Sequence, residues 1–146
     1  MHVHSREPNY EPPSDDPTVK VILADGGERP FTVADLQTLP ITSVANCFIV
    51  TDHGTVGPYT FQGVALRDLA AHLGLGPLGA EIVSGDGFGA QLTAEELASP
   101  APPLLSYGVD GRLLSRQEGL VRLVVPGDQE DALRQVKWVA TVRFSV

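Results

Sequence analysis

The last fourteen residues of the chain, LRQVKWVATVRFSV at Leu133–Val146, contain the clearest strand pattern in the sequence. Apolar side chains occupy every second position, at Val136, Trp138, Ala140, Val142, Phe144 and Val146. Polar side chains lie between them, at Lys137, Thr141, Arg143 and Ser145. Successive side chains of a strand point to opposite faces. The segment therefore predicts a strand with one face in the core and the other at least partly in contact with water.

Upstream of this segment, short strand patterns flank turn sequences. Hairpins are predicted over residues 18–33, 80–92 and 104–114. The first and the third have Asp-Gly at the turn, and these residues supply the positive φ angles that tight hairpin turns need. Apolar runs predict further strands over residues 41–51 and 121–127. Strands therefore dominate the expected fold.

Three short helices are expected between these strands. The first begins after Thr32 as the N-cap and ends before Pro40. The second has apolar residues at helical spacing and a glycine at its C-cap position, namely Leu66, Leu69, Ala70, Leu73 and Gly74. Thr93 and Glu96 form a capping box before a one-turn helix. Because strands and helices do not alternate regularly, the predicted fold class is α+β.

Length and charge limit the classes of function. The 146 residues suit one domain, which we place at 18–146, after a proline-rich tail at 1–17 that we expect to be flexible. The formal net charge of −8 argues against a nucleic-acid partner, because such proteins need clustered Lys and Arg. No apolar run approaches the ~20 residues of a membrane span. We therefore expect a soluble, cytoplasmic protein with no membrane partner.

Cys47 is the only cysteine of the chain, so no internal disulfide can form. It lies in the middle of a predicted strand, next to Phe48, Ile49 and Val50. Free cysteines in such surroundings usually behave as small buried hydrophobes. We interpret Cys47 as a core residue and predict no metal ligand there.

Asp52 and His53 follow the same strand and precede a glycine. The pair suits a turn, and it also suits an acid–base pair in which the carboxylate orients the imidazole. Both residues are therefore candidate catalytic residues. A hydrolase would also need a positioned nucleophile, and the sequence contains no motif for one.

Arg134 and Lys137 bracket the start of the last strand. Two cations three residues apart at such a place can converge on one anion, and an arginine can grip two oxygens at once. The spacing indicates a candidate site for a small anionic ligand or cofactor.

Six motifs occur in a fixed order from Phe31 to Val146. They are TLP at 38–40, FQGVALRDL at 61–69, GDGF at 85–88, VDGRLL at 109–114, VRLVVPG at 121–127 and LRQVKW at 133–138. In this order they resemble the molybdopterin-binding domain of the sulfite oxidase family of oxidoreductases, in which FQGVALRDL corresponds to the start of a helix. The resemblance implies a sheet-rich, layered α+β fold with short helices and a cleft for molybdopterin.

The resemblance also assigns site residues. In the family, the arginine and lysine of the Arg-x-Val-Lys segment help to bind the anionic cofactor, which implies that Arg134 and Lys137 are cofactor-binding residues here. Residues at Thr51 to His53 would lie beside the molybdenum.

The sequence departs from the family pattern at three places. The cysteine that binds molybdenum in the family ends the strand after the Leu-Pro, and this place falls near Thr51 and Asp52 rather than at Cys47. A His-Gly pair that often precedes the Arg-Leu-Val-Val-Pro strand is Glu-Gly at 118–119. The loop that we predict over residues 51–60 is shorter than that of the family and lacks its arginines.

Two interpretations remain open from the sequence. The chain is either a molybdopterin-dependent oxidoreductase or its cofactor-binding module, or it is a non-enzymatic relative whose cleft holds a small anion or a protein partner. The sequence does not identify a substrate, a redox partner, another protein partner or an oligomeric state.

Overall fold

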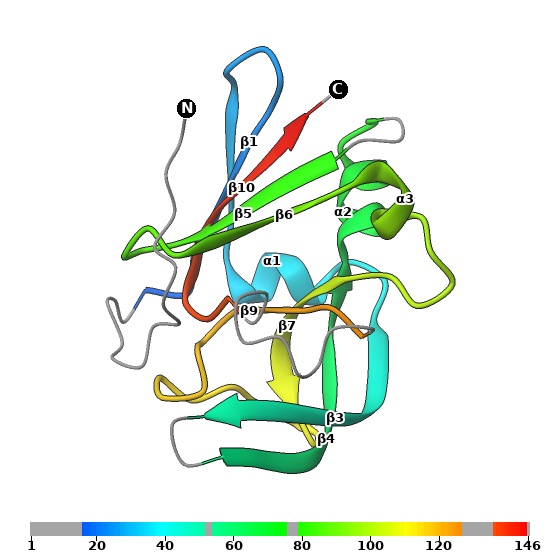
Figure 1. Ribbon diagram of the computed structural model, residues 1–146. Coiled ribbons are helices and arrows are strands. Elements are labelled where there is room, and N and C mark those ends of the chain that lie inside the picture. Colours follow the sequence, from blue (N-terminus) through cyan, green and yellow to red (C-terminus); the bar gives the residue numbers. More distant parts are fainter. Residues whose placement is uncertain (1–15, 52–53, 76–78, 127–135, 146) are drawn as a thin grey trace.

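The computed structural model describes residues 16–51, 54–75, 79–126 and 136–145, and this part of the chain forms two five-stranded sheets (Figure 1). The first sheet has the order β2 (Glu28–Phe31), β1 (Val19–Ile22), β10 (Val139–Ser145), β5 (Gly79–Ser84) and β6 (Gly89–Leu92). The second has the order β3 (Thr42–Thr51), β4 (Gly54–Ala65), β7 (Leu104–Val109) and β8 (Arg112–Leu113), with β9 (Arg122–Val124) also paired to β7.

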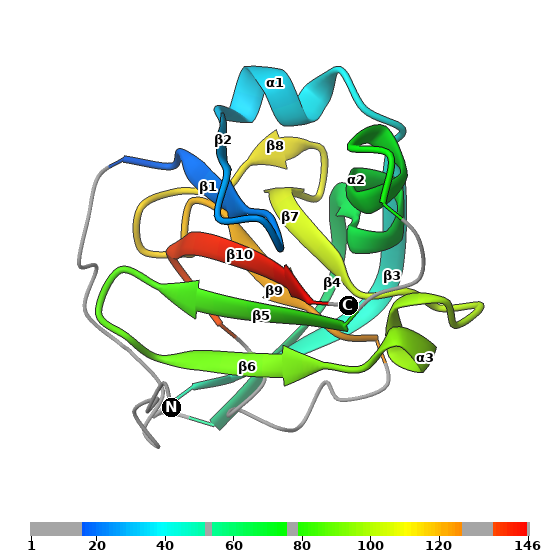
Figure 2. The same cartoon turned by 90° about the horizontal axis from the view of Figure 1, so that it is seen from above.

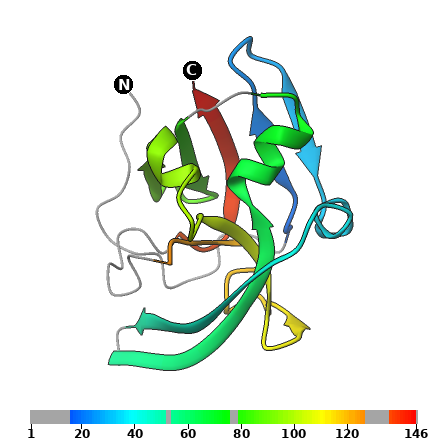
Figure 3. The ribbon, with the colours of Figure 1, turned by 90° about the vertical axis from the view of Figure 1, so that its right-hand side faces the viewer.

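Only β1 and β10 pair in parallel among the described strands. They bring the first and last strands of the domain together at the centre of the first sheet (Figure 2). In Figure 3, the β3–β4 hairpin extends away from this sheet. The C-terminal segment with the clear strand pattern is therefore the central strand of this sheet.

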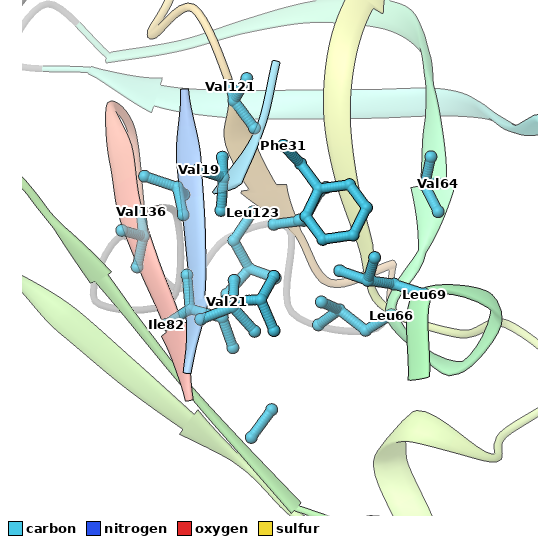
Figure 4. Close-up of a cluster of buried hydrophobic side chains, with 14 of the residues drawn as sticks. Val19, Val21, Phe31, Val64, Leu66, Leu69, Ile82, Val121, Leu123 and Val136 are labelled. Atoms are coloured by element: carbon cyan, nitrogen blue, oxygen red, sulfur yellow. The ribbon is translucent and has the colours of Figure 1, made fainter. Parts of the chain in front are cut away.

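The larger core receives side chains from both sheets and from the helices. Figure 4 shows Phe31, Leu69 and Leu123 turned toward the same interior space, one from the first sheet, one from a helix and one from the second sheet. A smaller cluster lies within the second sheet and consists of Cys47, Phe61, Leu104, Val109, Leu114 and Val124. The smaller cluster supports the candidate site described below.

Three short helices complete the described structure: α1 (Val33–Gln37), α2 (Leu66–His72) and α3 (Ala94–Leu97). All three were expected, and so were their caps. The Thr32 hydroxyl accepts a hydrogen bond from the backbone N–H of Asp35, and Gly74 follows α2 with φ +73°. Within the described residues, no helix combines the length and apolar character needed to cross a membrane.

The three predicted hairpins are confirmed as β1–β2, β5–β6 and β7–β8. At the turn of the third, Asp110 and Gly111 have φ of 50° and 84°, the left-handed values that the Asp-Gly pair was expected to supply. The α+β class with dominant sheets is confirmed as well.

The prediction of a loop over residues 51–60 is wrong, and so is the helix start that the resemblance placed at Phe61, whereas the helix predicted from the apolar spacing at Leu66 is confirmed. Residues 54–65 form the long strand β4, and α2 begins only at Leu66. Gly63, near the end of this strand, has a packing role. A Cβ at Gly63 would lie 2.0 Å from the carbonyl oxygen of Leu105, so glycine permits the close pairing of β4 with β7.

The strict alternation predicted for the last strand is also wrong at its beginning. β10 starts at Val139, because Trp138 has φ 52° and the register with β5 shifts between Val139 and Thr141. This bulge turns Val139 into the core and leaves Ala140 partly exposed, the reverse of the prediction. From Val142 onward the alternation holds.

Candidate functional site

A pocket of about 160 Å³ lies beside the smaller cluster, between β4, β9, the β8–β9 connection and the segment that leads into β10. Its apolar lining comes from Val56, Tyr59, Phe61, Val109 and Leu114. Its polar lining comes from Gln117, Glu118, Arg122 and Lys137. The pocket therefore combines two cations, Arg122 and Lys137, and one carboxylate, Glu118, with an apolar wall formed by the five residues above.

Arg122 is the most deeply buried charged residue of this pocket, with 3% of its surface exposed. Its place follows from the alternation of β9, because Val121 and Leu123 enter the larger core while Val124 joins the smaller cluster. Arg122 lies between Val121 and Leu123, so its side chain must point away from the larger core and toward the pocket, although it carries a charge.

The guanidinium of Arg122 is held on two sides. Its Nη1 donates a hydrogen bond to the backbone oxygen of Glu118 at 3.1 Å, and its carbon Cζ lies 5.4 Å from the centroid of the Phe61 ring. Its Nε has no hydrogen-bond partner among the described residues. Burial lowers the pKa of Arg122 to about 10, which still leaves it a cation at neutral pH. Arg122 is therefore a buried cation beside the pocket whose hydrogen-bonding capacity the described residues do not fully use.

Lys137 is the second cation of the pocket. Its Nζ lies 4.8 Å from the centroid of the Trp138 ring, and the indole Nε1 in turn donates to the backbone oxygen of Arg116 at 2.7 Å. Gly119 has φ +113°, and a Cβ there would lie 2.9 Å from Cβ of Lys137. The lysine stem therefore packs against the β8–β9 connection at a point where only glycine fits without strain.

Glu118 brings a negative charge to the same rim. The backbone N–H of Ser115 donates to its Oε1 at 2.9 Å, and the backbone N–H of Glu118 donates to the Ser115 hydroxyl at 3.2 Å, as in a capping box. Arg112 donates to both carboxylate oxygens, at 2.6 and 2.7 Å. The Arg112 hydrogen bonds are the main reason that the pKa of Glu118 falls to about 2. The carboxylate is ionised at neutral pH, and Arg112 compensates much of its charge.

Cys47 lies in the smaller cluster and has 1% of its surface exposed. Its Sγ is 3.5 Å from the backbone oxygen of Val44, to which the thiol donates. Burial raises the pKa of the Cys47 thiol, and the charge of Arg122 opposes this only in part. The cysteine packs in one cluster with the pocket-lining Phe61 and Leu114, and it does not itself line the pocket.

The structure describes only part of the predicted site. Arg134, Asp52 and His53 lie outside the described residues, so their predicted roles stay predictions. Thr51 is the last residue of β3, where it pairs with Gly54. Of the predicted anion-binding pair, Lys137 lines the pocket. The described residues contain no group of three or more His, Cys, Asp or Glu side chains that could hold a metal ion.

Sequence reasoning did not identify two charged residues of the pocket as site residues, Arg122 and Glu118. Arg122 is the single charged residue in the apolar run VRLVVPG, and a lone cation in a buried strand is a signal for a functional or paired charge. Glu118 ends the pattern Ser115-x-x-Glu118, which matches a capping box and could have located its carboxylate.

Comparisons with known proteins agree with this architecture. The family described as the oxidoreductase molybdopterin binding domain matches residues 13–146. The crystal structure of the sulfane dehydrogenase SoxCD from Paracoccus pantotrophus superimposes with a TM-score of 0.70 at 20% sequence identity, over 87% of this chain. This chain covers only 37% of that one, so the likeness shows the fold of a part of it. No curated protein matches the sequence.

Since the family match spans nearly the whole chain, the protein belongs to the oxidoreductase molybdopterin-binding domain family, as its ordered motifs predicted.

Proposed function

We propose that this domain binds a small anion in the pocket beside Arg122 and Lys137, and that it does not hold molybdenum through a cysteine thiolate. The observation that carries the proposal is the buried and only partly compensated charge of Arg122. The cation is almost wholly buried, lines a pocket, and keeps its Nε without a partner among the described residues.

The energetics of burial support an anionic ligand. Removing a charged group from water costs several kcal/mol, and the cost is recovered only when an opposite charge or hydrogen bonds compensate it. The backbone oxygen of Glu118 and the Phe61 ring supply part of the compensation for Arg122. An anion in the pocket beside Arg122 would supply more of it through its opposite charge, and Lys137 would add a second favourable charge.

The same residues fit the molybdenum of the family cofactor poorly. Soft thiolate is the protein ligand that the resemblance leads one to expect. The only cysteine of the chain is Cys47, whose thiol is buried, turned toward a backbone oxygen and kept protonated by burial. No other residue type can offer a thiolate, so the chain cannot ligate the metal in that way without rearranging its smaller cluster.

The family match favours a second candidate, an oxidoreductase domain that binds molybdopterin. In that case Lys137 and Arg134 would contact the anionic cofactor, as the resemblance implies. The only cysteine is buried and offers no accessible thiolate for molybdenum, which is why we place this candidate second.

Two measurements on the full chain separate the candidates. The protein is purified from a host that synthesises molybdopterin, and its molybdenum content and acid-released pterin fluorescence are determined. We expect neither at a stoichiometric level, whereas stoichiometric amounts of both would favour the second candidate.

The anion site is tested with a panel of acetate, benzoate, phosphate and sulfate in thermal unfolding and calorimetry. At least one anion should raise the Tm of the wild type and of Arg143→Met, a matched control on the exposed side of β10, but not of Arg122→Met. A panel without effect on the wild type, or with an equal effect on Arg122→Met, would contradict the proposal.

A further inference from the structure

We infer that the pocket selects a monoanionic carboxylate with a compact apolar body, of about the size of benzoate. The inference rests on the proposed anion-binding function and names the class of ligand that this site takes.

The apolar wall gives the first reason. Five of the nine lining residues are aromatic or aliphatic, and they come from β4, from β7 and from the residue after β8. An inorganic oxyanion has no apolar surface to place against this wall. A ligand with a hydrocarbon body would displace water from it, and each methylene buried there should tighten binding about fourfold.

The size of the pocket sets the length of that body. A cavity of roughly 150 Å³ in a protein interior holds a benzene ring. The pocket here has about 160 Å³, which matches one six-membered ring or a branched chain of similar volume.

The polar end of the pocket selects a single negative charge. Arg122 and Lys137 both line the pocket, and their two positive charges favour a carboxylate. Glu118 lines the same rim and stays ionised, because Arg112 holds its pKa near 2. A second negative charge on the ligand would meet this carboxylate, so a monoanion is preferred over a dianion such as sulfate or hydrogen phosphate.

The experiment is a calorimetric titration of the full chain at pH 7 with benzoate, and with probes that differ from it in stated ways. Benzamide lacks the charge, acetate lacks the ring, sulfate lacks the ring and adds a charge, and 2-naphthoate adds a second ring. We expect benzoate to bind at least tenfold more tightly than each of the four, and Arg122→Met to lose this advantage of benzoate over benzamide. Arg143→Met should titrate like the wild type.

Each other result decides against the inference in its own way. If acetate or sulfate binds as tightly as benzoate and depends on Arg122, the apolar body is irrelevant; the inference then fails while the proposed anion site stands. If benzamide matches benzoate, or Arg122→Met binds benzoate as the wild type does, the pocket is only apolar and both proposals fail. If 2-naphthoate matches benzoate, the size limit is wrong and the inference fails. If no anion binds, both proposals fail.

Discussion

The carboxylate of Glu118 accepts hydrogen bonds from both terminal nitrogens of Arg112, at 2.6 and 2.7 Å, while the backbone oxygen of the same glutamate accepts one from buried Arg122 at 3.1 Å. One residue therefore connects an exposed arginine on β8 with the buried arginine of the pocket. Because planar bidentate pairs fix orientation as well as charge, Arg112 sets both the position and the effective charge of this rim from outside the pocket.

Replacing Arg112 by glutamine should weaken anion binding without touching the pocket lining. The carboxylate of Glu118 would lose its compensating charge and would repel the ligand. Since the Arg112 side chain is 56% exposed, we expect only a roughly two- to fivefold loss of benzoate affinity. Calorimetric titration at low salt checks this, with Arg143→Gln as the control. An unchanged dissociation constant would show that the pair has no part in the electrostatics of the pocket.

The pKa of Glu118 predicts a dependence of stability on pH. The folded-state pKa is about 2, below the ordinary value of 4.5, so the ionised carboxylate stabilises the fold above pH 4.5. This contribution should disappear as the pH falls from about 5 to 2. The difference in free energy of unfolding between wild type and Glu118→Gln, from urea denaturation, should shrink over that interval. A difference that stays constant from pH 6 to pH 2.5 would contradict the assignment.

Serine in place of Cys47 should cost stability and leave ligand binding alone. The substitution puts a hydroxyl into a cluster of apolar side chains, where a polar group costs about 1–3 kcal/mol even when it finds some compensation. Urea denaturation measures the loss, and benzoate titration of the folded variant should match the wild type. A variant of wild-type stability that loses ligand would place the sulfur in the site.

Methionine in place of Arg122 should fold with a stability close to or above that of the wild type. Replacing a poorly compensated buried charge by an apolar side chain of similar length is often neutral or stabilising, by up to about 4 kcal/mol. The midpoint of urea denaturation without added anions gives the answer. A large loss of stability would mean that Arg122 serves the fold more than a ligand.

Alanine at Gly119 should weaken the fold more than alanine at Gly26. Both glycines have positive φ, at +113° and +89°, so both substitutions bring backbone strain of about 1–3 kcal/mol. Only at Gly119 would the new Cβ meet another residue, Lys137, at 2.9 Å, whereas nothing lies within 4 Å at Gly26. Thermal unfolding of the two variants provides the comparison, and Gly119→Ala should also bind benzoate less tightly. Equal effects of the two substitutions on stability and binding would show that the contact with Lys137 is unimportant.

Local chemistry explains which parts of the fold could be predicted from sequence. The turn at Asp110 and Gly111 and the capping box at Thr93 and Glu96 depend on a few neighbouring residues, and the structure places both as expected. β4 depends on a distant contact instead. Gly63 permits the close pairing of β4 with β7, and no local pattern reveals that partner.

The candidate site was less predictable for the same reason. Lys137 was singled out from its spacing to Arg134 and from the resemblance, and it does line the pocket. Arg122 was overlooked, because an arginine inside an apolar strand gives no sign of which side it faces. Its role depends on the combination of β9 with Phe61 and with the backbone at Glu118, and only the tertiary structure brings these together.

The most direct test of the account is the NMR signal of the Arg122 Nε–H group, recorded in a ¹⁵N-edited spectrum and assigned by its absence from Arg122→Met. Because Arg122 lines the pocket, an anion bound beside its guanidinium changes the surroundings of this group, and adding benzoate should shift the resonance progressively until the shift saturates. The dissociation constant from this shift should equal the calorimetric one. A resonance that does not move while benzoate binds elsewhere, or in the absence of any binding, would contradict the claim that this arginine is the anion receptor of the domain.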